Sequence, residues 1–263
     1  MDYLIIGGDG RFARLTRLLA RRGAQVGVLG RDAAPGVRAV GEEAPGRAKR
    51  IVSNWPPRGE VTGEALLAAA GNARLYLCGP GHPGNVGNNI ADLWADEALL
   101  QRNAALTAEG AVSAAMRASD RALRDLRCLV IGWGRIGRSL TELLVPLCAG
   151  VTVASRSEAG QHRAVERGAE AVDTAHIAGA LPGHGLVFNT APGMVLDGDA
   201  LQHADRDAMI VDLASPPYGV DLAAAWSFGL RAWREPGLPG RYCPESAALA
   251  LLEAIDRYDE GED

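Results

Sequence analysis

RCLVIGWGRIGRSL, residues 127–140, is the stretch that decides the fold of this chain. It contains a turn of the form GxGxxG between an apolar strand and an amphipathic helix. The first glycine allows a tight bend, the second lets backbone amides approach a pyrophosphate, and the third allows close helix packing. We therefore predict a dinucleotide site here; a glycine-rich turn without a ligand is the alternative. The residues assigned to it are Gly132, Gly134, Arg135, Ile136 and Gly137.

The end of the next strand predicts which dinucleotide is bound. The strand VTVAS, residues 151–155, runs into Ser155, Arg156 and Ser157, with no carboxylate at its tip. NAD sites place an Asp or Glu there for the ribose 2′-hydroxyl. A guanidinium between two hydroxyls instead suits a 2′-phosphate, because arginine forms charge-assisted bidentate bonds. We expect NADP rather than NAD, although Arg156 could also be an ordinary solvated side chain.

Strand and helix patterns alternate with short connections from residue 127 to residue 234, and a βαβ pattern opens the chain at residues 3–29. Such alternation is typical of doubly wound parallel sheets. We predict an α/β protein of two Rossmann-like domains with a cleft between them. Residues 1–105 form the substrate-side domain and residues 106–243 the NADP-binding domain. By analogy with two-domain dehydrogenases, the helix at 244–258 is expected to pack back on the first domain.

The ends of two later strands are further candidates for the site. Asn189-Thr190-Ala191-Pro192 and Asp212-Leu213-Ala214-Ser215 both follow apolar strands. Such ends line the cleft of a doubly wound sheet. We assign Thr190, Ala191, Pro192 and Asp212 to the cofactor and Ser215 to the substrate. The alternative is that these residues only cap their strands.

The first glycine turn, Gly8 to Ala13, fits GxGxxG/A loosely, with Asp32 at a suitable distance for a second cofactor site. We prefer one cofactor site, because Asp9 and Arg11 fill this turn with charge and the strand pattern breaks down after it. Arg11 is therefore predicted to bind a substrate carboxylate. An exposed arginine at a helix start is the alternative.

Composition excludes several classes of function. The 263 residues carry a net charge of −5 with no basic cluster, which argues against nucleic acid as a partner. No run approaches the roughly 20 apolar residues that span a bilayer, so we predict a cytoplasmic protein without a membrane partner. The four cysteines lie far apart without CxxC spacing, so we expect core residues rather than metal ligands or disulfides.

Several segments, in this order, resemble the A subunit of dipicolinate synthase. The likeness is strongest from Asn103 to Ala247 and thin from Asp32 to Pro83. The segments are GGDGR (7–11), NAALTAEGA (103–111), GWGRIG with ASRS, NTAPG (189–193), DLASPPYGVD (212–221) and EPGLPGRYCPESA (235–247).

This resemblance implies a two-domain NADP-dependent dehydrogenase, similar to the D-2-hydroxyacid dehydrogenases, that oxidises a dihydrodipicolinate-type ring to dipicolinate. It further implies a role in dipicolinate biosynthesis during sporulation, often beside a flavoprotein-like second subunit. We also expect a homo-oligomer. The alternatives are an NADP-dependent enzyme for another small oxo or imino acid, and a non-catalytic NADP-binding sensor or partner subunit.

The resemblance also places Arg11, Asn103, Thr107 and Glu109 in the substrate cleft. We take Glu109, with Asn103, as the candidate catalytic residues because Glu109 can exchange a proton; a salt-bridged carboxylate near a helix start is the alternative. No histidine lies in a matched motif.

The chain departs from the family pattern at two places near the expected substrate. Where the family has basic residues after DLAS and after the last Pro of the final motif, this chain has Pro216 and Glu245. Both departures remove positive charge that a dicarboxylate would use.

Overall fold

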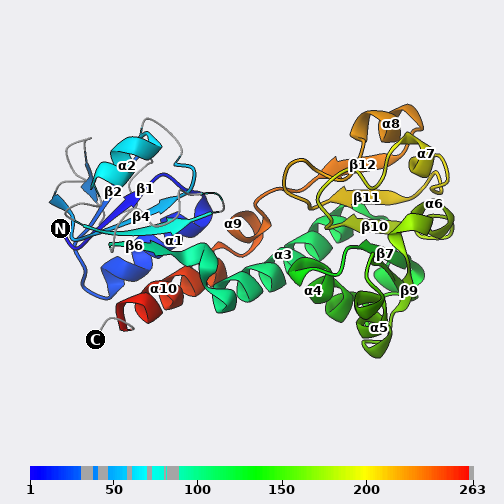
Figure 1. Cartoon of the computed structure of the whole chain (residues 1–263), viewed down its shortest axis with the longest axis horizontal. Coiled ribbons are helices and arrows are strands. Elements are labelled where there is room, and N and C mark those ends of the chain that lie inside the picture. The colour runs from blue at the N-terminus through cyan, green and yellow to red at the C-terminus, as the bar shows by residue number, and fades with distance from the viewer. Residues whose placement is uncertain are drawn as a thin grey trace. The chain divides into compact units, whose positions relative to one another are not determined.

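The computed structural model describes residues 1–30, 38–40, 47–57, 61–69, 73–79, 81 and 89–260. It divides into two compact units. Unit 1 comprises Met1–Asn103 and Pro239–Asp263, and unit 2 comprises Ala104–Leu238. In Figure 1 the chain runs from unit 1 (blue to cyan) through unit 2 (green to orange) and returns to unit 1 (red).

The described part of unit 1 contains a six-stranded parallel sheet. Its order, β3-β2-β1-β4-β5-β6, is that of a Rossmann sheet. Alternate residues of β1 face two layers: Ile5 packs toward α1 and α10, whereas Leu4 and Ile6 pack toward α2. The strands are β1 (Tyr3–Ile6), β2 (Val26–Leu29), β3 (Arg38–Ala39), β4 (Arg50–Asn54), β5 (Arg74–Cys78) and β6 (Ile90–Asp92).

The last helix of the chain belongs to the core of unit 1. Leu251 and Ile255 of α10 share a cluster of buried side chains with Phe12 and Leu19 of α1. In Figure 1, α10 accordingly lies beside α1. The helices that contribute to this unit are α1 (Gly10–Arg21), α2 (Gly63–Ala69), η2 (Leu93–Ala95), the start of α3 (Glu97–Ala118), α9 (Leu238–Tyr242) and α10 (Pro244–Glu260).

Unit 2 repeats the same topology. Its parallel strands are ordered β12-β11-β10-β7-β8-β9, which is the order of unit 1 read from the opposite edge. The predicted class, α/β with two Rossmann-like doubly wound parallel sheets, is confirmed. The strands are β7 (Arg127–Ile131), β8 (Gly150–Ala154), β9 (Glu170–Val172), β10 (Leu186–Asn189), β11 (Met209–Asp212) and β12 (Arg231–Arg234).

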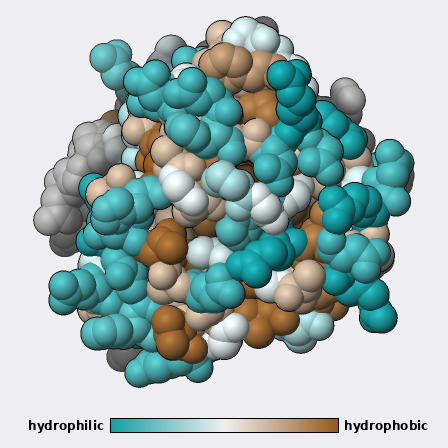
Figure 2. Space-filling view, turned by 90° about the vertical axis from the view of Figure 1, so that its right-hand side faces the viewer, coloured by the Kyte–Doolittle hydropathy of each residue, from teal (hydrophilic) through white to brown (hydrophobic). Residues whose placement is uncertain are grey.

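Short helices cover this second sheet. Leu129 and Ile131 of β7 share a buried cluster with Leu201 and Ala225 from two of these helices. The face of unit 2 at the right-hand side of Figure 1 is mostly hydrophilic, with separate hydrophobic patches (Figure 2). Across the described residues, no helix is long and apolar enough to cross a membrane. The helices are η3 (Leu123–Asp125), α4 (Arg135–Leu144), α5 (Glu158–Glu166), η4 (Thr174–His176), α6 (Ile177–Ala180), α7 (Gly198–Leu201) and α8 (Leu222–Ser227).

Candidate dinucleotide site

The glycine turn between β7 and α4 has the geometry that its sequence predicts. Gly132 has a φ of +102°, in the left-handed region that glycine adopts without strain. A Cβ at Gly137 would clash with the carbonyl oxygen of Gly132, so α4 can pack on the turn only with glycine there. A Cβ at Gly134 would meet nothing within 4 Å. The turn is therefore closely packed at Gly137, on the side of α4, and open to a ligand at Gly134.

A cavity of about 820 Å³ lies in front of this turn, within unit 2. Its walls come from the turn itself, the end of β8, the start of η4 and the loop after β10. This volume falls within the range typical of small-molecule sites. Eight residues predicted to bind the cofactor line it: Gly132, Gly134, Ser155, Arg156, Ser157, Thr190, Ala191 and Pro192.

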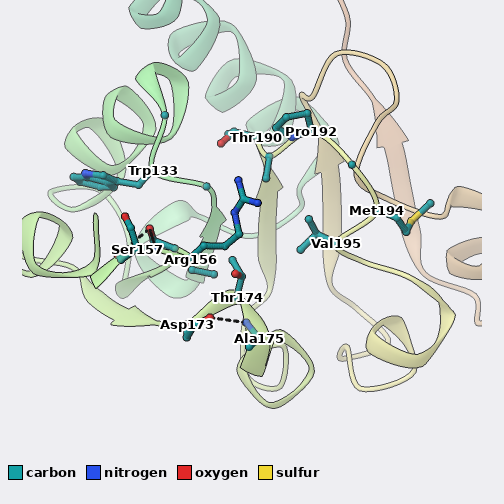
Figure 3. A pocket seen from close by; sticks show the side chains of 16 residues that line it. Trp133, Arg156, Ser157, Asp173, Thr174, Ala175, Thr190, Pro192, Met194 and Val195 are labelled. Atoms are coloured by element: carbon teal, nitrogen blue, oxygen red, sulfur yellow. Dashed lines mark hydrogen bonds between the residues drawn. The ribbon is translucent and has the colours of Figure 1, made fainter. Parts of the chain in front are cut away.

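Arg156 is the cation of this cavity. Figure 3 shows its side chain extending from the end of β8 into the space between Trp133, Thr190 and Thr174. Among the described residues, its guanidinium makes no hydrogen bond or ion pair. It is exposed, so an anion entering the cavity can reach it.

The residues on either side of Arg156 are fixed by hydrogen bonds. Ser157 Oγ accepts from the backbone N–H of Gly160 at 3.1 Å and so caps α5. Gln161 Nε2 donates to the carbonyl oxygen of Ser155 at 2.8 Å. The end of β8 therefore holds the base of the arginine in place and leaves its charged end available.

Sequence reasoning missed part of the cavity wall. Asp173, Thr174 and Ala175 line it opposite the glycine turn, and Asp173 Oδ1 accepts from the backbone N–H of Ala175 at 2.8 Å. The only signal for them was the short strand β9, because the loop carries no motif. Trp133 and residues 193–195 were also missed.

Four residues predicted to bind the cofactor do not line the cavity. Arg135 is exposed at the start of α4, Ile136 follows it, and Gly137 is buried behind the turn. Asp212 is buried and links the end of β10 to the loop after β11. Its Oδ1 accepts from Asn189 Nδ2 at 2.8 Å, and its Oδ2 accepts from the N–H of Gly219 at 3.2 Å. The strand-capping alternative describes Asp212 better than a contact with the cofactor.

In unit 1 the structure brings Arg11 and Asn103 together. Asp9 holds the guanidinium of Arg11 through Nε and Nη2 at 2.8–3.1 Å, and Arg11 Nη1 donates to Asn103 Oδ1 at 3.4 Å. A substrate carboxylate would therefore meet an arginine that is already paired on one side.

The first glycine turn packs closely against its neighbours. A Cβ on Gly240 would clash with the Asp9 carboxyl, so α9 packs directly on the turn, and a Cβ on Gly8 would clash with Phe12. The preference for a single cofactor site stays a prediction. Asp32, the acidic partner of the alternative second site, lies outside the described residues.

The other predicted substrate residues are placed separately. Glu109 is exposed on α3 and lines a groove of about 430 Å³ with Leu143 and Leu147, not the dinucleotide cavity. Thr107 is buried in α3. Ser215 is exposed after β11, where its carbonyl accepts from the N–H of Tyr218 at 3.0 Å. Neither Thr107 nor Ser215 lines this groove or the dinucleotide cavity.

The two departures from the family pattern also have a place in the structure. Pro216 is exposed in the loop after β11. Glu245 lies in the first turn of α10, where its Oε2 is 3.7 Å from Nε of Arg14.

Within the described ranges, no group of His, Cys, Asp and Glu side chains could hold a metal ion.

Comparisons with known proteins agree with this geometry. The A subunit of dipicolinate synthase from Bacillus subtilis (strain 168) is 30% identical over 155 residues. The match covers 59% of this chain and 52% of that relative, so the chain spans about half the length of the curated relative it matches. The predicted resemblance is confirmed. No protein-family model matches the chain.

Solved structures share the fold over almost the whole chain. The A subunit of dipicolinate synthase from Bacillus halodurans has a TM-score of 0.83 at 23% identity, covering 98% of this chain and 97% of that chain. D-2-hydroxyisocaproate dehydrogenase has a TM-score of 0.57 at 14% identity, covering 100% of this chain and 98% of that chain. The fold is therefore one that this chain shares with dehydrogenases.

Proposed function

We propose that this chain, which resembles the A subunit of dipicolinate synthase, is an oxidoreductase that binds NADP in the cavity of unit 2. The observation that carries the proposal is the Arg156 guanidinium, which has no partner among the described residues and extends into a cavity bounded by a GxGxxG turn. The similarity to a synthase and to dehydrogenase folds supports an oxidoreductase.

The residues of the cavity fit a dinucleotide. The open face of Gly134 and the N-terminus of α4 suit a pyrophosphate, because backbone N–H groups there point outward. When bound, NADP would accept a hydride at its nicotinamide. The loop Thr190–Pro192 would orient the ring, since Thr190 Oγ1 is itself fixed by donating to the carbonyl oxygen of Ile131 at 2.8 Å.

The choice of NADP over NAD rests on Arg156 and Ser157. A guanidinium can bind a phosphate through two parallel bonds, and the neighbouring hydroxyl can donate a third. The acidic residue of the cavity wall, Asp173, already uses one oxygen to cap η4. The 2′-phosphate of NADP could therefore form an ion pair with Arg156, whereas NAD, which lacks that phosphate, could not.

The substrate part of the proposal is a dihydrodipicolinate-type ring, oxidised to dipicolinate. Arg11 and Asn103 would bind one carboxylate, with the guanidinium pre-oriented by Asp9. The acid/base role of Glu109 and the roles of Thr107 and Ser215 stay predictions, because these side chains do not line the cavity. Pro216 and Glu245 favour the alternative that the substrate is another small oxo or imino acid.

A coupled assay tests the reaction. Aspartate semialdehyde, pyruvate and NADP are supplied with dihydrodipicolinate synthase, and NADPH and pyridine dicarboxylate absorbance are followed with time. We expect both signals to rise together. Turnover only with a panel of small oxo or imino acids would replace the substrate. NADP binding with no turnover on any substrate would instead indicate a sensor or partner subunit.

Self-association is a further part of the proposal. It is supported by the groove of about 430 Å³ that Glu109 of α3 lines with Leu143 and Leu147. Met116 is 57% exposed and Leu147 is 45% exposed there, so the groove presents apolar side chains to solvent. Glu109 and Arg117 both line this groove, and they lie four residues before and four residues after Ser113. A two-fold axis at Ser113 would therefore place Glu109 against the partner's Arg117.

Sedimentation of the wild type and of Met116→Glu tests this contact. We expect a dimer that the substitution converts to a monomer. A monomeric wild type, or a variant that remains dimeric, would contradict the assignment. The same proposal includes a role in sporulation and a flavoprotein-like second subunit, which rest on the resemblance, and a cytoplasmic location, which rests on the sequence pattern.

A further inference from the structure

Two of the four cysteines lie in contact in unit 2. Cys128 is fully buried in β7, and Cys148 is half-buried in the turn after α4. Their Sγ atoms are 3.3 Å apart. The backbone N–H of Ala149 donates to the carbonyl oxygen of Leu126 at 2.9 Å, which holds this turn against the start of β7. The contact is therefore supported by the fold around it.

We propose that Cys128 and Cys148 are an oxidation site, at which the two thiols close to a disulfide. A disulfide has a sulfur–sulfur distance of about 2.05 Å, so the half-buried Cys148 has to move only slightly. The closed loop would contain the whole GxGxxG turn and α4. This inference does not depend on which dinucleotide or substrate the protein uses.

The environments of the two thiols give them different roles. The contact lowers the pKa of the Cys148 thiol, whereas the same contact and burial raise the pKa of the Cys128 thiol. Cys148 is also the more accessible of the two. It is therefore the thiol that forms a thiolate and attacks first.

The oxidant would be a low-molecular-weight disulfide of the glutathione class. The Cys148 thiolate attacks one of its sulfurs, forms a mixed disulfide and displaces one thiolate. The Cys128 thiol then loses its proton and attacks Sγ of Cys148, which displaces the second thiolate. Two protein thiols are oxidised, and one small disulfide is reduced to two thiols.

Closure should stabilise unit 2 without changing the cofactor site. A crosslink across about 20 residues restricts the unfolded chain. Cys128 lies four residues before Gly132, or about 13 Å along an extended strand, so the disulfide forms well away from the front of the turn. Thermal stability should rise while dinucleotide affinity stays unchanged.

The test compares reduced wild type with Cys148→Ser and, as a matched control, Cys243→Ser. Each protein is incubated with oxidised glutathione, its free thiols are counted, and its peptides are mapped. We expect the wild type and Cys243→Ser to lose two thiols, to yield one peptide that links residues 128 and 148, and to gain about 5 °C in Tm, reversed by dithiothreitol. Cys148→Ser should show no crosslink and no such gain.

Two results would overturn the proposal. In one, wild type keeps all four thiols throughout the incubation with oxidised glutathione. In the other, Cys148 carries glutathione but never links to Cys128. Both readouts are made on the folded wild type, so a poorly folding variant does not remove the test.

Discussion

Ser157 Oγ accepts a hydrogen bond from the backbone N–H of Gly160 at 3.1 Å, and this bond fixes where β8 ends and α5 begins. A Cβ at position 160 would clash with Ser155 Oγ, so only glycine lets the helix start this close to the strand. Arg156 lies between the two serines. The backbone at the base of its side chain is therefore held beside a helix cap, whereas its guanidinium bonds to no described residue.

Gly134→Val should abolish dinucleotide binding and leave the fold intact. A Cβ at this position meets nothing within 4 Å, so the larger side chain enters the cavity rather than the core. Calorimetry should detect no binding, and circular dichroism should be that of wild type. Gly137→Ala is the matched control: its Cβ clashes with the Gly132 carbonyl oxygen, so it should lower stability. Binding retained by soluble Gly134→Val would place the dinucleotide elsewhere.

Asp212→Asn should destabilise unit 2 by about 1–3 kcal/mol, because a buried acceptor is replaced by a group that also donates. Three donors, Asn189 Nδ2 and the backbone N–H groups of Ala214 and Gly219, point at the present carboxylate. Urea unfolding measures the loss. Asp207→Asn, at an exposed acid, is the control and should change stability little. Wild-type stability of Asp212→Asn would show that this network contributes nothing.

Unit 2 should lose stability as the pH falls below about 6.5, through His184. Burial lowers the pKa of His184 from its ordinary value of 6.5, and its Nε2 lies 2.9 Å from Thr152 Oγ1. The unfolded chain therefore takes up a proton at a higher pH than the folded chain, so protonation favours unfolding. Stability measured between pH 8 and pH 5 should fall in wild type and in His162→Gln, an exposed control, and fall less in His184→Gln. Equal slopes for all three would contradict this.

Arg11→Lys should impair turnover without changing NADP affinity. The three bonds from Arg11 to Asp9 need a planar guanidinium, and Lys would lose both that orientation and the contact of Nη1 with Asn103. Both KM and kcat should worsen, because the residue would orient the substrate as well as bind it. Steady-state kinetics on the true substrate gives the answer. Unchanged kcat/KM in Arg11→Ala would leave this residue only a structural role, through its bonds to Asp9 and Asn103.

Much of the cavity wall could be predicted from sequence because the patterns that mark it are local. The glycine turn, the serines around Arg156 and the segment Thr190–Pro192 each follow a buried strand, and parallel strands end at one edge of a sheet. The loop at Asp173 could not be predicted, since its strand is short and its side chains match no motif.

The rest of the site depends on contacts between distant segments, which no local pattern reveals. Asp212 fits a strand-end cofactor ligand by spacing, but Asn189 and Gly219 use its oxygens. Cys128 and Cys148 are too far apart in sequence to suggest a pair, and the fold brings them into contact. The division into domains at residues 105 and 106 stays a prediction.

The affinity of Arg156→Ala for NADP and for NAD, measured by calorimetry beside wild type, tests the central claim most directly. Arg156 is the cation that extends into the cavity, and no protein acceptor among the described residues competes for it. We predict that the variant loses about 1–3 kcal/mol of NADP affinity, the range for bonds to a charged group, while NAD affinity barely changes. Equal losses for both dinucleotides, or no loss for NADP, would contradict it.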